Sequence, residues 1–442
     1  MKPTRIMLPL LAAISSLATI QLMGCSDSKA NPMSSQQTQN PWYEDGAAQV
    51  QNKLAQLPLD HKGQAKNIIL IVGDGMGVST VTASRILQGQ LQGQTGEENL
   101  LSFERFPFSG FSKTYNTNQQ TPDSAGTMTA MMTGVKTDAG VINYSEKIER
   151  STCPVQEKSE QLTSALELAE LAGKSTGIVT TAGVTHATPA ATYARSPERG
   201  WESDDKIPDS EKANGCEDIA SQLVNFETRL KQRYPESKNI NGLEVVMGGG
   251  RRHFLPADAA YNVETPSDKI EGKRQDGQHL INQWQQQYPA GHYVQSENQL
   301  NKINFEITDK LLGLFHPAHM RYEANRKHDD LGEPSLKTMA LSALNVLEKN
   351  EDGYFLMVEA GRIDHGHHAG NAYNALHETI MLSDTVEAIL NRVNLEETLI
   401  IVTADHSHVM TIAGYPKRGN PILGKVVGPN KSEPTLDRKS VV

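Results

Sequence analysis

One stretch of the chain, residues 354–370, concentrates side chains that bind metal ions. It begins with an apolar, partly β-branched run that is typical of a strand buried on both faces. Directly after this run come Glu359, Asp364, His365, His367 and His368. Divalent metals require such oxygen and imidazole ligands. If the segment after Gly361 is helical, Asp364 and His368 lie on one face and could bind one ion. For any single histidine here, a solvated loop is the alternative.

Two further strand-like runs also end in polar side chains. Asp74 follows residues 67–72, and the pair Asp405 and His406 follows residues 399–403. Open α/β sheets bind their ligands at the carboxyl ends of the strands. Asp74, Glu359, Asp405 and His406 should therefore converge on one edge of the sheet. Charged loops at strand ends are common, so each residue alone is weak evidence.

Ser124 lies where a nucleophile could be activated. The sequence PDSAGT at residues 122–127 precedes a run of small residues that favours a helix. At a helix N-terminus, backbone N–H groups and the helix dipole stabilise a phosphoryl group. A metal ion nearby would lower the pKa of the hydroxyl and make it a nucleophile. The alternative is that Asp123 or Ser124 only caps the helix.

Three other polar residues follow a strand-like run at residues 176–181. His186 and Thr188 could bind magnesium or support its ligands. Arg199 lies in a loop that could direct two N–H groups of its guanidinium at a dianion. A solvated loop arginine is the alternative.

The elements that must position these residues alternate along the chain. Strand-like runs lie at residues 67–72, 176–181, 245–247, 354–358 and 399–403, and amphipathic segments at 79 onward, 160–171, 216–232, 335–349 and 371–392. This alternation, with continuous apolar strands, predicts an α/β fold: a large, mostly parallel central sheet with helices on both faces. Residues 251–326 are rich in Gln, Asn, Asp and Tyr, and we expect them to form an insertion at the rim of the sheet.

Composition supports one large domain. The chain has 442 residues, of which 37% are apolar, so it can bury a sizeable core. Its net charge of −10 argues against a nucleic-acid partner, because phosphate backbones recruit basic surfaces. A small anionic substrate held by metal ions remains compatible with this charge.

The N-terminus predicts export. Residues 1–24 have the basic and apolar regions of a signal peptide, and the sequence LMGC at residues 22–25 resembles a bacterial lipobox. Cys25 would then carry the lipid that anchors the chain to a membrane of the bacterial cell envelope, as a periplasmic or outer-membrane lipoprotein. An ordinary secretory signal is the alternative. Polar residues 25–45 predict a flexible tether, and residues 46–442 the folded domain.

Two cysteines remain after Cys25. Cys153 and Cys216 form an even pair in an exported chain, which predicts a disulfide bond. Free buried thiols are the alternative.

Several motifs together resemble the alkaline phosphatase family of metal-dependent phosphomonoesterases, and in detail its animal branch. They are GDGMG at residues 73–77, PDSAGT at 122–127, HATPAATYAR at 186–195, VEAGRIDHGHH at 358–368 and TADHSH at 403–408. The resemblance runs from about residue 67 to 423. It implies hydrolysis of phosphate monoesters with broad specificity, two zinc ions and one magnesium ion as cofactors, and a homodimer. The positions of Cys153 and Cys216 also resemble the disulfide of the animal branch.

The resemblance also implies a role for each residue. Ser124 would be the phosphorylated nucleophile, and Arg199 would bind the phosphoryl oxygens. The implied metal ligands are Asp364 and His368 for a first zinc, Asp74, Asp405 and His406 for a second zinc, and Asp74, Thr188 and Glu359 for magnesium. Asp123, His186 and His365 would contact these residues and hold them in position without binding a metal ion themselves.

The chain departs from the family pattern in one zinc ligand. The family takes a further histidine for the first zinc from a segment beyond TADH, and the last histidine here is His408. We therefore expect the C-terminal part of the family domain to be missing, or His408 or water to replace that ligand. The alternatives are an envelope protein that binds phosphate or metal without turnover, and a related sulfatase or phosphodiesterase. Ser124 does not lie in the Cys/Ser-x-Pro-x-Arg setting that sulfatases need.

A second departure concerns calcium. The animal enzymes have a glutamate where this chain has His316, and an aspartate where it has Glu333. Imidazole is a poor ligand for a hard ion such as Ca²⁺. We therefore predict no calcium site.

Overall fold

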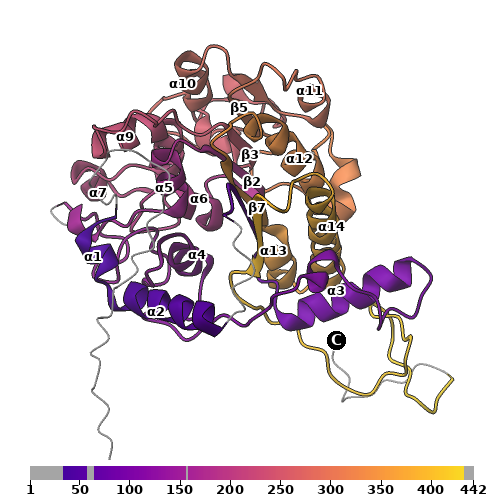
Figure 1. Cartoon of the computed structure of the whole chain (residues 1–442). Coiled ribbons are helices and arrows are strands. Elements are labelled where there is room, and N and C mark those ends of the chain that lie inside the picture. Colours follow the sequence, from indigo (N-terminus) through magenta and orange to yellow (C-terminus); the bar gives the residue numbers. More distant parts are fainter. Residues whose placement is uncertain (1–32, 57–63, 156–157, 433–442) are drawn as a thin grey trace, which may run out of the picture. The chain divides into compact units, whose positions relative to one another are not determined.

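The computed structural model describes residues 33–56, 64–155 and 158–432, which belong to one compact unit (Figure 1). The predicted signal peptide, the lipidation residue Cys25 and residues 26–32 of the expected tether lie outside the described residues. In the described part of the chain, no helix is both long enough and apolar enough to cross a bilayer.

A seven-stranded sheet forms the centre of this unit, and all its paired strands are parallel. Its strands are β1 (Asn67–Gly73), β2 (Ser175–Gly183), β3 (Val245–Gly249), β4 (His292–Val294), β5 (Leu311–Leu314), β6 (Tyr354–Ala360) and β7 (Thr398–Ala404). Their order is β4-β5-β3-β2-β6-β1-β7. The α/β fold and all five predicted strands are confirmed.

Helices connect the strands. The α-helices are α1 (Ser35–Thr38), α2 (Pro41–Gln56), α3 (Val78–Leu91), α4 (Ser124–Thr133), α5 (Ala165–Leu171), α6 (Ala187–Tyr193), α7 (Asp209–Ala213), α8 (Ile219–Val224), α9 (Phe226–Arg233), α10 (Leu280–Gln287), α11 (Glu297–Leu300), α12 (Leu336–Leu347), α13 (Arg362–His368) and α14 (Ala372–Leu390). Short 3-10 helices are η1 (Ser102–Arg105), η2 (Lys158–Glu160), η3 (Asp204–Lys206), η4 (Arg251–Phe254), η5 (Ala259–Tyr261) and η6 (Glu323–His328).

Helices lie on both faces of the sheet, as Figure 1 shows, although Leu399 and Ile401 of the edge strand β7 are exposed. Along β1, Leu70 and Val72 belong to a core shared with α4, α5, α6 and α8, whereas Ile69 and Ile71 belong to a core shared with α12 and α14. Successive side chains of a strand point to opposite faces, so one apolar run serves both cores. Helices therefore cover both faces of the sheet, as predicted.

The structure corrects two helix boundaries. The predicted helix at residues 216–232 is interrupted at Asn225, which ends α8 and begins α9. The helix predicted from residue 160 begins only at Ala165. Ser164 accepts a hydrogen bond from the Glu167 backbone N–H, and the Glu167 side chain accepts one from the Ser164 N–H. This capping box fixes the start of α5.

Part of the expected tether is folded. Residues 35–38 form α1, and residues 41–45 form the start of α2, which continues to residue 56 in the predicted folded domain. The Gln37 side chain is almost completely buried and donates hydrogen bonds to the carbonyl oxygens of Thr133 and Thr163. These bonds satisfy a buried amide and tie α1 to the end of α4.

Residues 251–326, expected at the rim of the sheet, contain two strands that the sequence did not reveal. β4 and β5 have three and four residues and extend the sheet at one edge. Runs this short carry little periodicity, which is why the pattern of apolar residues missed them. α10 packs against β4 in the same region.

A buried carboxyl group on α14 predicts a pH dependence of stability. Burial raises the pKa of Glu378 to about 8, above the value of about 4.3 for an exposed glutamate. The folded chain therefore binds this proton more tightly than the unfolded chain, and the stability it contributes is lost as pH rises from about 4.3 through 8. Denaturant unfolding at several pH values should show that Glu378→Gln weakens this loss by roughly 2–4 kcal/mol. Glu387→Gln, at an exposed position of the same helix, is the control. Equal pH profiles for wild type and Glu378→Gln would contradict the expectation.

Candidate active site

Three neighbouring strands end at the same level. Gly73 at the end of β1 pairs with Ala360 of β6 on one side and with Ala404 of β7 on the other. This register places Asp74, the end of β6 and Asp405 side by side at one edge of the sheet. The predicted convergence of these residues is therefore present in the structure.

Ser124 faces this edge from the first residue of α4. Its Oγ lies 3.2 Å from both carboxylate oxygens of Asp74 and 3.3 Å from Nε2 of His406. Asp123 is the N-cap of α4, where its Oδ1 accepts the Gly126 N–H. The capping role considered for Asp123 is thus real, and it leaves the hydroxyl of Ser124 free to face the carboxylates.

Acidic and imidazole groups form three clusters along the edge. Within each cluster, one ligand atom from every residue lies within 4.8 Å of the others. The clusters are Asp364, His368 and His408; Asp74, Asp405 and His406; and Asp74, His186 and Glu359. Asp74 is shared by two clusters, so cations bound there would be close neighbours.

Several buried oxygen atoms at this edge of the sheet are of the kind that binds metal ions. Thr188 Oγ1 and Glu359 Oε1 are buried without a well-formed hydrogen bond among the described residues, and Asp364 Oδ1 is buried with the His408 imidazole beside it. Thr180 donates a hydrogen bond to the other oxygen of Glu359 and so fixes its orientation. Buried oxygens without a partner are costly, and a bound cation would satisfy them.

The electrostatics of the edge also favour cations. Burial raises the pKa of Asp74 well above its usual range, and the neighbouring carboxylates of Asp405, Asp364 and Glu359 raise it further. Burial raises the pKa of Glu359 to about 7. Several carboxylates crowded without cations resist ionisation, and divalent ions would reverse this effect. The residues present therefore fit the zinc and magnesium ions implied by the resemblance.

The orientation of His406 leaves one ring nitrogen available. Its Nδ1 lies 2.8 Å from the carbonyl oxygen of Ser407, which can only accept a hydrogen bond. Nδ1 must then carry a proton, which leaves Nε2 as the ring atom that could bind a metal ion. Nε2 faces Asp405 Oδ2 at 3.3 Å and Asp74 Oδ1 at 3.5 Å. Metal-binding histidines are often held in this way, by a hydrogen bond from the ring nitrogen that does not bind the ion.

The helix predicted after Gly361 exists as α13, and it brings Asp364 and His368 together. His368 Nε2 lies 3.4 Å from Asp364 Oδ2, and His408 Nε2 lies 3.3 Å from Asp364 Oδ1. Gly75 makes room for this group with a φ of +67°, because a Cβ there would lie 3.1 Å from Asp364. His408 thus occupies a place beside the two predicted ligands.

Arg199 bridges two predicted residues. Its Nη1 donates a hydrogen bond to Asp123 Oδ2 at 3.0 Å, and its Nη2 lies 3.0 Å from His186 Nε2. Although burial opposes it, the guanidinium lowers the pKa of Asp123. Burial and the same guanidinium lower the pKa of His186 well below its usual range. Asp123 therefore stays ionised and His186 neutral, and both hold Arg199 beside the N-terminus of α4.

One neighbour of the site was missed by sequence reasoning. The ring of His319 lies 4.3 Å from that of His365 and 5.2 Å from that of His186, between ring centroids. Its Nδ1 accepts a hydrogen bond from the Gly183 N–H at the end of β2. His319 follows β5, a strand that the sequence did not reveal, so nothing in the pattern placed it near the edge.

Comparison with known proteins decides the family. The sequence matches the profile of the alkaline phosphatase family over residues 65–437. It is 46% identical over 389 residues to the tissue-nonspecific alkaline phosphatase isozyme of Gallus gallus, covering 87% of this chain and 71% of the chicken protein. The human tissue-nonspecific isozyme is 44% identical over 387 residues, with the same coverage.

The chain belongs to the alkaline phosphatase family. Among solved structures, the alkaline phosphatase of Thermus thermophilus is similar, with a TM-score of 0.59 and 27% identity. The similarity covers 80% of this chain and 63% of the Thermus chain, so the chain spans less than two thirds of that protein. The enzyme of the Antarctic bacterium TAB5 shares the fold, with a TM-score of 0.57 and 22% identity.

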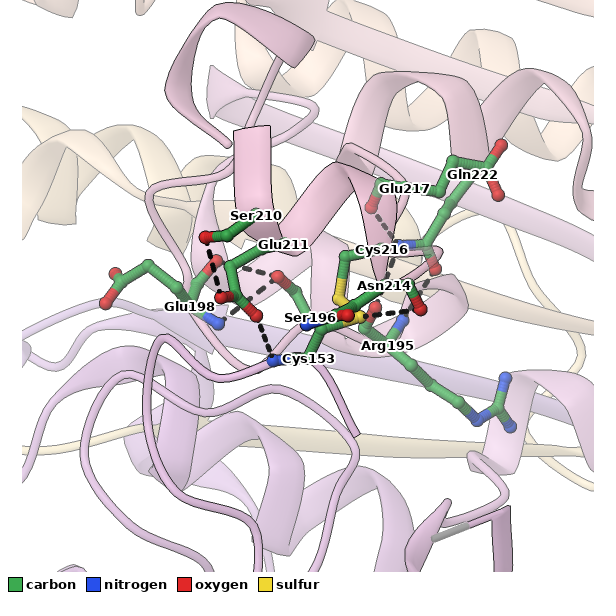
Figure 2. Close-up of a disulfide and its surroundings, with 10 residues drawn as sticks. All are labelled: Cys153, Arg195, Ser196, Glu198, Ser210, Glu211, Asn214, Cys216, Glu217 and Gln222. Carbon is green, nitrogen blue, oxygen red and sulfur yellow. Dashed lines mark hydrogen bonds between the residues drawn. A yellow bond between two sulfur atoms is a disulfide. The ribbon is translucent and has the colours of Figure 1, made fainter. Parts of the chain in front are cut away.

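In this member of the alkaline phosphatase family, a disulfide bond lies near the loop that carries Arg199. Cys153 and Cys216 are bonded, as predicted, and Figure 2 shows Glu211 accepting the Cys153 backbone N–H. Two residues before the disulfide, Ser151 donates its N–H to the carbonyl oxygen of Pro197 and its hydroxyl to Glu198.

Arg150 also links the segment before Cys153 to the loop that carries Arg199. It donates hydrogen bonds to both carboxylate oxygens of Glu198, at 2.6 and 3.0 Å. Glu198 directly precedes Arg199, whose own N–H is held by the Gly140 carbonyl oxygen. The disulfide, Ser151 and Arg150 together fix the backbone from which Arg199 reaches the site.

The disulfide should stabilise the chain measurably. It closes a loop of 63 residues, for which the loop-entropy model gives about 4 kcal/mol. Denaturant unfolding should show a loss of this size in Cys153→Ser, in Cys216→Ser and in the double variant, because removing either sulfur removes the same bond. Single variants as stable as wild type, or losses that add in the double variant, would contradict this expectation.

Proposed function

We propose that this chain hydrolyses phosphate monoesters with broad specificity through a phosphoserine intermediate on Ser124, using two zinc ions and one magnesium ion. The observation that carries the proposal is the position of Ser124 Oγ, 3.2 Å from Asp74 and 3.3 Å from His406 at a helix N-terminus. In that place a hydroxyl can attack phosphorus while residues around it hold cations.

The proposed ligands are the residues of the first two clusters, and, for magnesium, two carboxylates of the third cluster together with Thr188, whose Oγ1 is buried nearby. Asp364, His368 and His408 would hold a first zinc, Asp74, Asp405 and His406 a second zinc, and Asp74, Thr188 and Glu359 magnesium. We propose His408 as the third ligand of the first zinc, since its Nε2 lies 3.3 Å from Asp364 Oδ1. To bind the ion through Nε2, the ring would release the Val409 N–H that its Nδ1 accepts in this structure. When bound, the ions supply positive charge that lowers the pKa of the serine hydroxyl, stabilises the leaving oxygen and activates water.

The chain's own groups would do the rest of the chemistry. Ser124 Oγ forms a bond to phosphorus as the ester oxygen leaves on the opposite side, and water then displaces the serine and releases phosphate. Arg199 donates N–H groups to the equatorial oxygens, as do backbone N–H groups at the start of α4. Asp123 and His186 hold the guanidinium in place. His365 would hold His186 in position, because the two rings are in contact.

The proposal extends to location. We propose that Cys25 is lipidated after removal of residues 1–24, which would tether the folded unit to a bacterial envelope membrane. Intact mass of the protein from membranes would show the lipid on a chain beginning at Cys25. A chain that begins elsewhere and lacks the lipid would refute the anchor without affecting the catalytic proposal.

Metal removal should abolish turnover. With zinc and magnesium supplied, the purified full chain should hydrolyse p-nitrophenyl phosphate at alkaline pH, and chelation should lower the rate at least about 100-fold. Adding both ions back should restore it. Tight phosphate binding without turnover would favour the alternative of a binding protein. Faster hydrolysis of p-nitrophenyl sulfate or of bis(p-nitrophenyl) phosphate would favour a sulfatase or phosphodiesterase.

A further inference from the structure

A cavity of about 330 Å³ lies between α5, the end of α6 and α9. None of the proposed catalytic or metal-binding residues lines it. Its charged lining residues are three arginines, Arg195, Arg229 and Arg233, and one acid, Glu167. Three positive charges and one negative charge give the lining a net charge of +2, although the whole chain has a net charge of −10. The cavity is therefore a place that attracts anions.

The α9 helix presents two of these arginines on the face that packs against the protein. Four lining residues of this helix follow the spacing i, i+3, i+4 and i+7, which places side chains on one face: Phe226, Arg229, Leu230 and Arg233. Phe226 and Leu230 are buried, whereas the two arginines are partly exposed. The fold thus holds both guanidinium groups at the cavity, beside buried apolar side chains.

The charge of Arg195 is already balanced. Its Nη1 and Nη2 donate hydrogen bonds to the two carboxylate oxygens of Glu167, at 2.8 and 2.5 Å. Glu167 also accepts the Ser164 N–H at the start of α5, at 3.0 Å. Burial raises the pKa of Glu167, but the Arg195 guanidinium outweighs burial and lowers it. The one acid in the lining is therefore ionised and paired with Arg195.

The other two arginines are not balanced within the cavity. Arg229 donates a hydrogen bond to Glu217, which does not line the cavity. Arg233 forms no salt bridge to a carboxylate among the described residues, and its Nη1 and Nη2 donate to the neutral side-chain and backbone oxygens of Gln161, both at 3.2 Å. Burial lowers the pKa of Arg233, and the charge of Arg195 lowers it further. A bound anion would stabilise this cation.

A buried hydroxyl group shows that the three guanidinium groups lie near one another. Burial raises the pKa of the Tyr144 hydroxyl, and all three arginines of the cavity lower it. Tyr144 is only 7% exposed. Charges act on a common group when they lie close to it, because solvent and salt screen more distant ones. The positive charges are therefore concentrated in one place.

We propose that this cavity binds phosphate, either as the inorganic ion or as the phosphoryl group of a small organic phosphate. The planar fork of a guanidinium group matches phosphate oxygens and can donate two N–H groups to them. The cavity lies at the lower limit of small-molecule pockets, which have volumes of roughly 300–1,000 Å³. It is larger than a phosphate ion, so an organic group would fit beside the buried rings of Phe226 and Tyr193.

Counting bound phosphate in matched variants tests this inference. The zinc- and magnesium-loaded full chain is dialysed to equilibrium against radioactive inorganic phosphate. Arg233→Gln should bind phosphate at this site roughly 10- to 100-fold more weakly, because it loses charge-assisted hydrogen bonds. At concentrations that saturate wild type, it should therefore contain one phosphate per chain fewer. Lys231→Gln removes an exposed charge of the same helix outside the lining and should match wild type. Equal binding by wild type and Arg233→Gln would overturn the proposal.

A second variant guards against misfolding. Arg229 is partly exposed, so Arg229→Gln should fold even if Arg233→Gln does not, and it should show the same loss of phosphate. If only Arg229→Gln folds, wild-type phosphate binding in this variant would overturn the proposal.

Phenylphosphonate distinguishes the two sources of phosphate, because phosphatases do not hydrolyse its C–P bond. If it displaces the phosphate that Arg233→Gln lacks, the site binds organic phosphates. If that phosphate stays bound, the site binds the inorganic ion.

The result is separate from that of the proposed catalytic function. Arg233→Gln should hydrolyse p-nitrophenyl phosphate at the wild-type rate, because Arg233 bonds to Gln161 and Thr163, which have no proposed catalytic role. If the catalytic edge binds no phosphate, wild type and Arg233→Gln each contain one phosphate fewer. The difference of one phosphate between them remains.

Discussion

Ser124→Ala should lower kcat for p-nitrophenyl phosphate by a factor on the order of 10⁴–10⁶, as loss of a nucleophile does in other hydrolases that use serine. The substitution removes the oxygen that would form the bond to phosphorus. Zinc and magnesium content should remain at wild-type values, because the proposed ligands are untouched. Steady-state kinetics combined with metal analysis gives both results.

A matched control separates the hydroxyl from the surroundings of α4. Thr121→Ala removes an exposed hydroxyl three positions before Ser124 and should leave kcat close to wild type. If Ser124→Ala retains wild-type kcat with full metal content, Ser124 is not the nucleophile. If the metal content of Ser124→Ala falls, the lower rate would reflect the lost metal ions and not the missing oxygen.

His408→Ala should lower kcat/KM roughly 100-fold or more and remove one zinc per chain at zinc concentrations that saturate wild type. The reason is geometric: with His408 gone, only Asp364 and the exposed His368 remain in that cluster. Two protein ligands hold zinc weakly. Excess zinc should partly restore the rate of His408→Ala. If His408 instead donated a proton in the reaction, added zinc would not restore the rate.

His377→Ala is the control for this experiment. His377 lies partly exposed on α14, where its Nδ1 lies 2.7 Å from the carbonyl oxygen of Tyr373 one turn earlier. Its removal should change neither zinc content nor kcat/KM. If His408→Ala keeps its zinc and its rate, a water molecule or another residue takes the place that we propose for His408.

Much of the edge could be predicted because it depends on local patterns. The apolar runs that form β1, β6 and β7 are continuous. Asp74 directly follows β1, Asp405 directly follows β7, and Glu359 is the last residue but one of β6. Parallel strands in one sheet end on the same side, so Asp74 and Asp405 had to approach each other. The spacing of Asp364 and His368 then required only a helix, which α13 supplies.

Other features depend on contacts between distant segments and left no local signal. β4 and β5 are too short to show a period, so His319, which follows β5, could not be placed. The burial of Gln37 against Thr133 and Thr163 could not be read from a polar N-terminal segment. The interruption of the helix at Asn225 also escaped the amphipathic pattern, which continues across it.

The central claim is that side chains from remote parts of the chain meet at one sheet edge so that Ser124 can accept a phosphoryl group. Its most direct test is to incubate the zinc- and magnesium-loaded full chain with radioactive inorganic phosphate, quench it in acid and locate the label by peptide mass spectrometry. We predict a label on Ser124 that disappears when the metals are removed first. A label on another residue, or turnover of p-nitrophenyl phosphate with none on Ser124, would contradict the account.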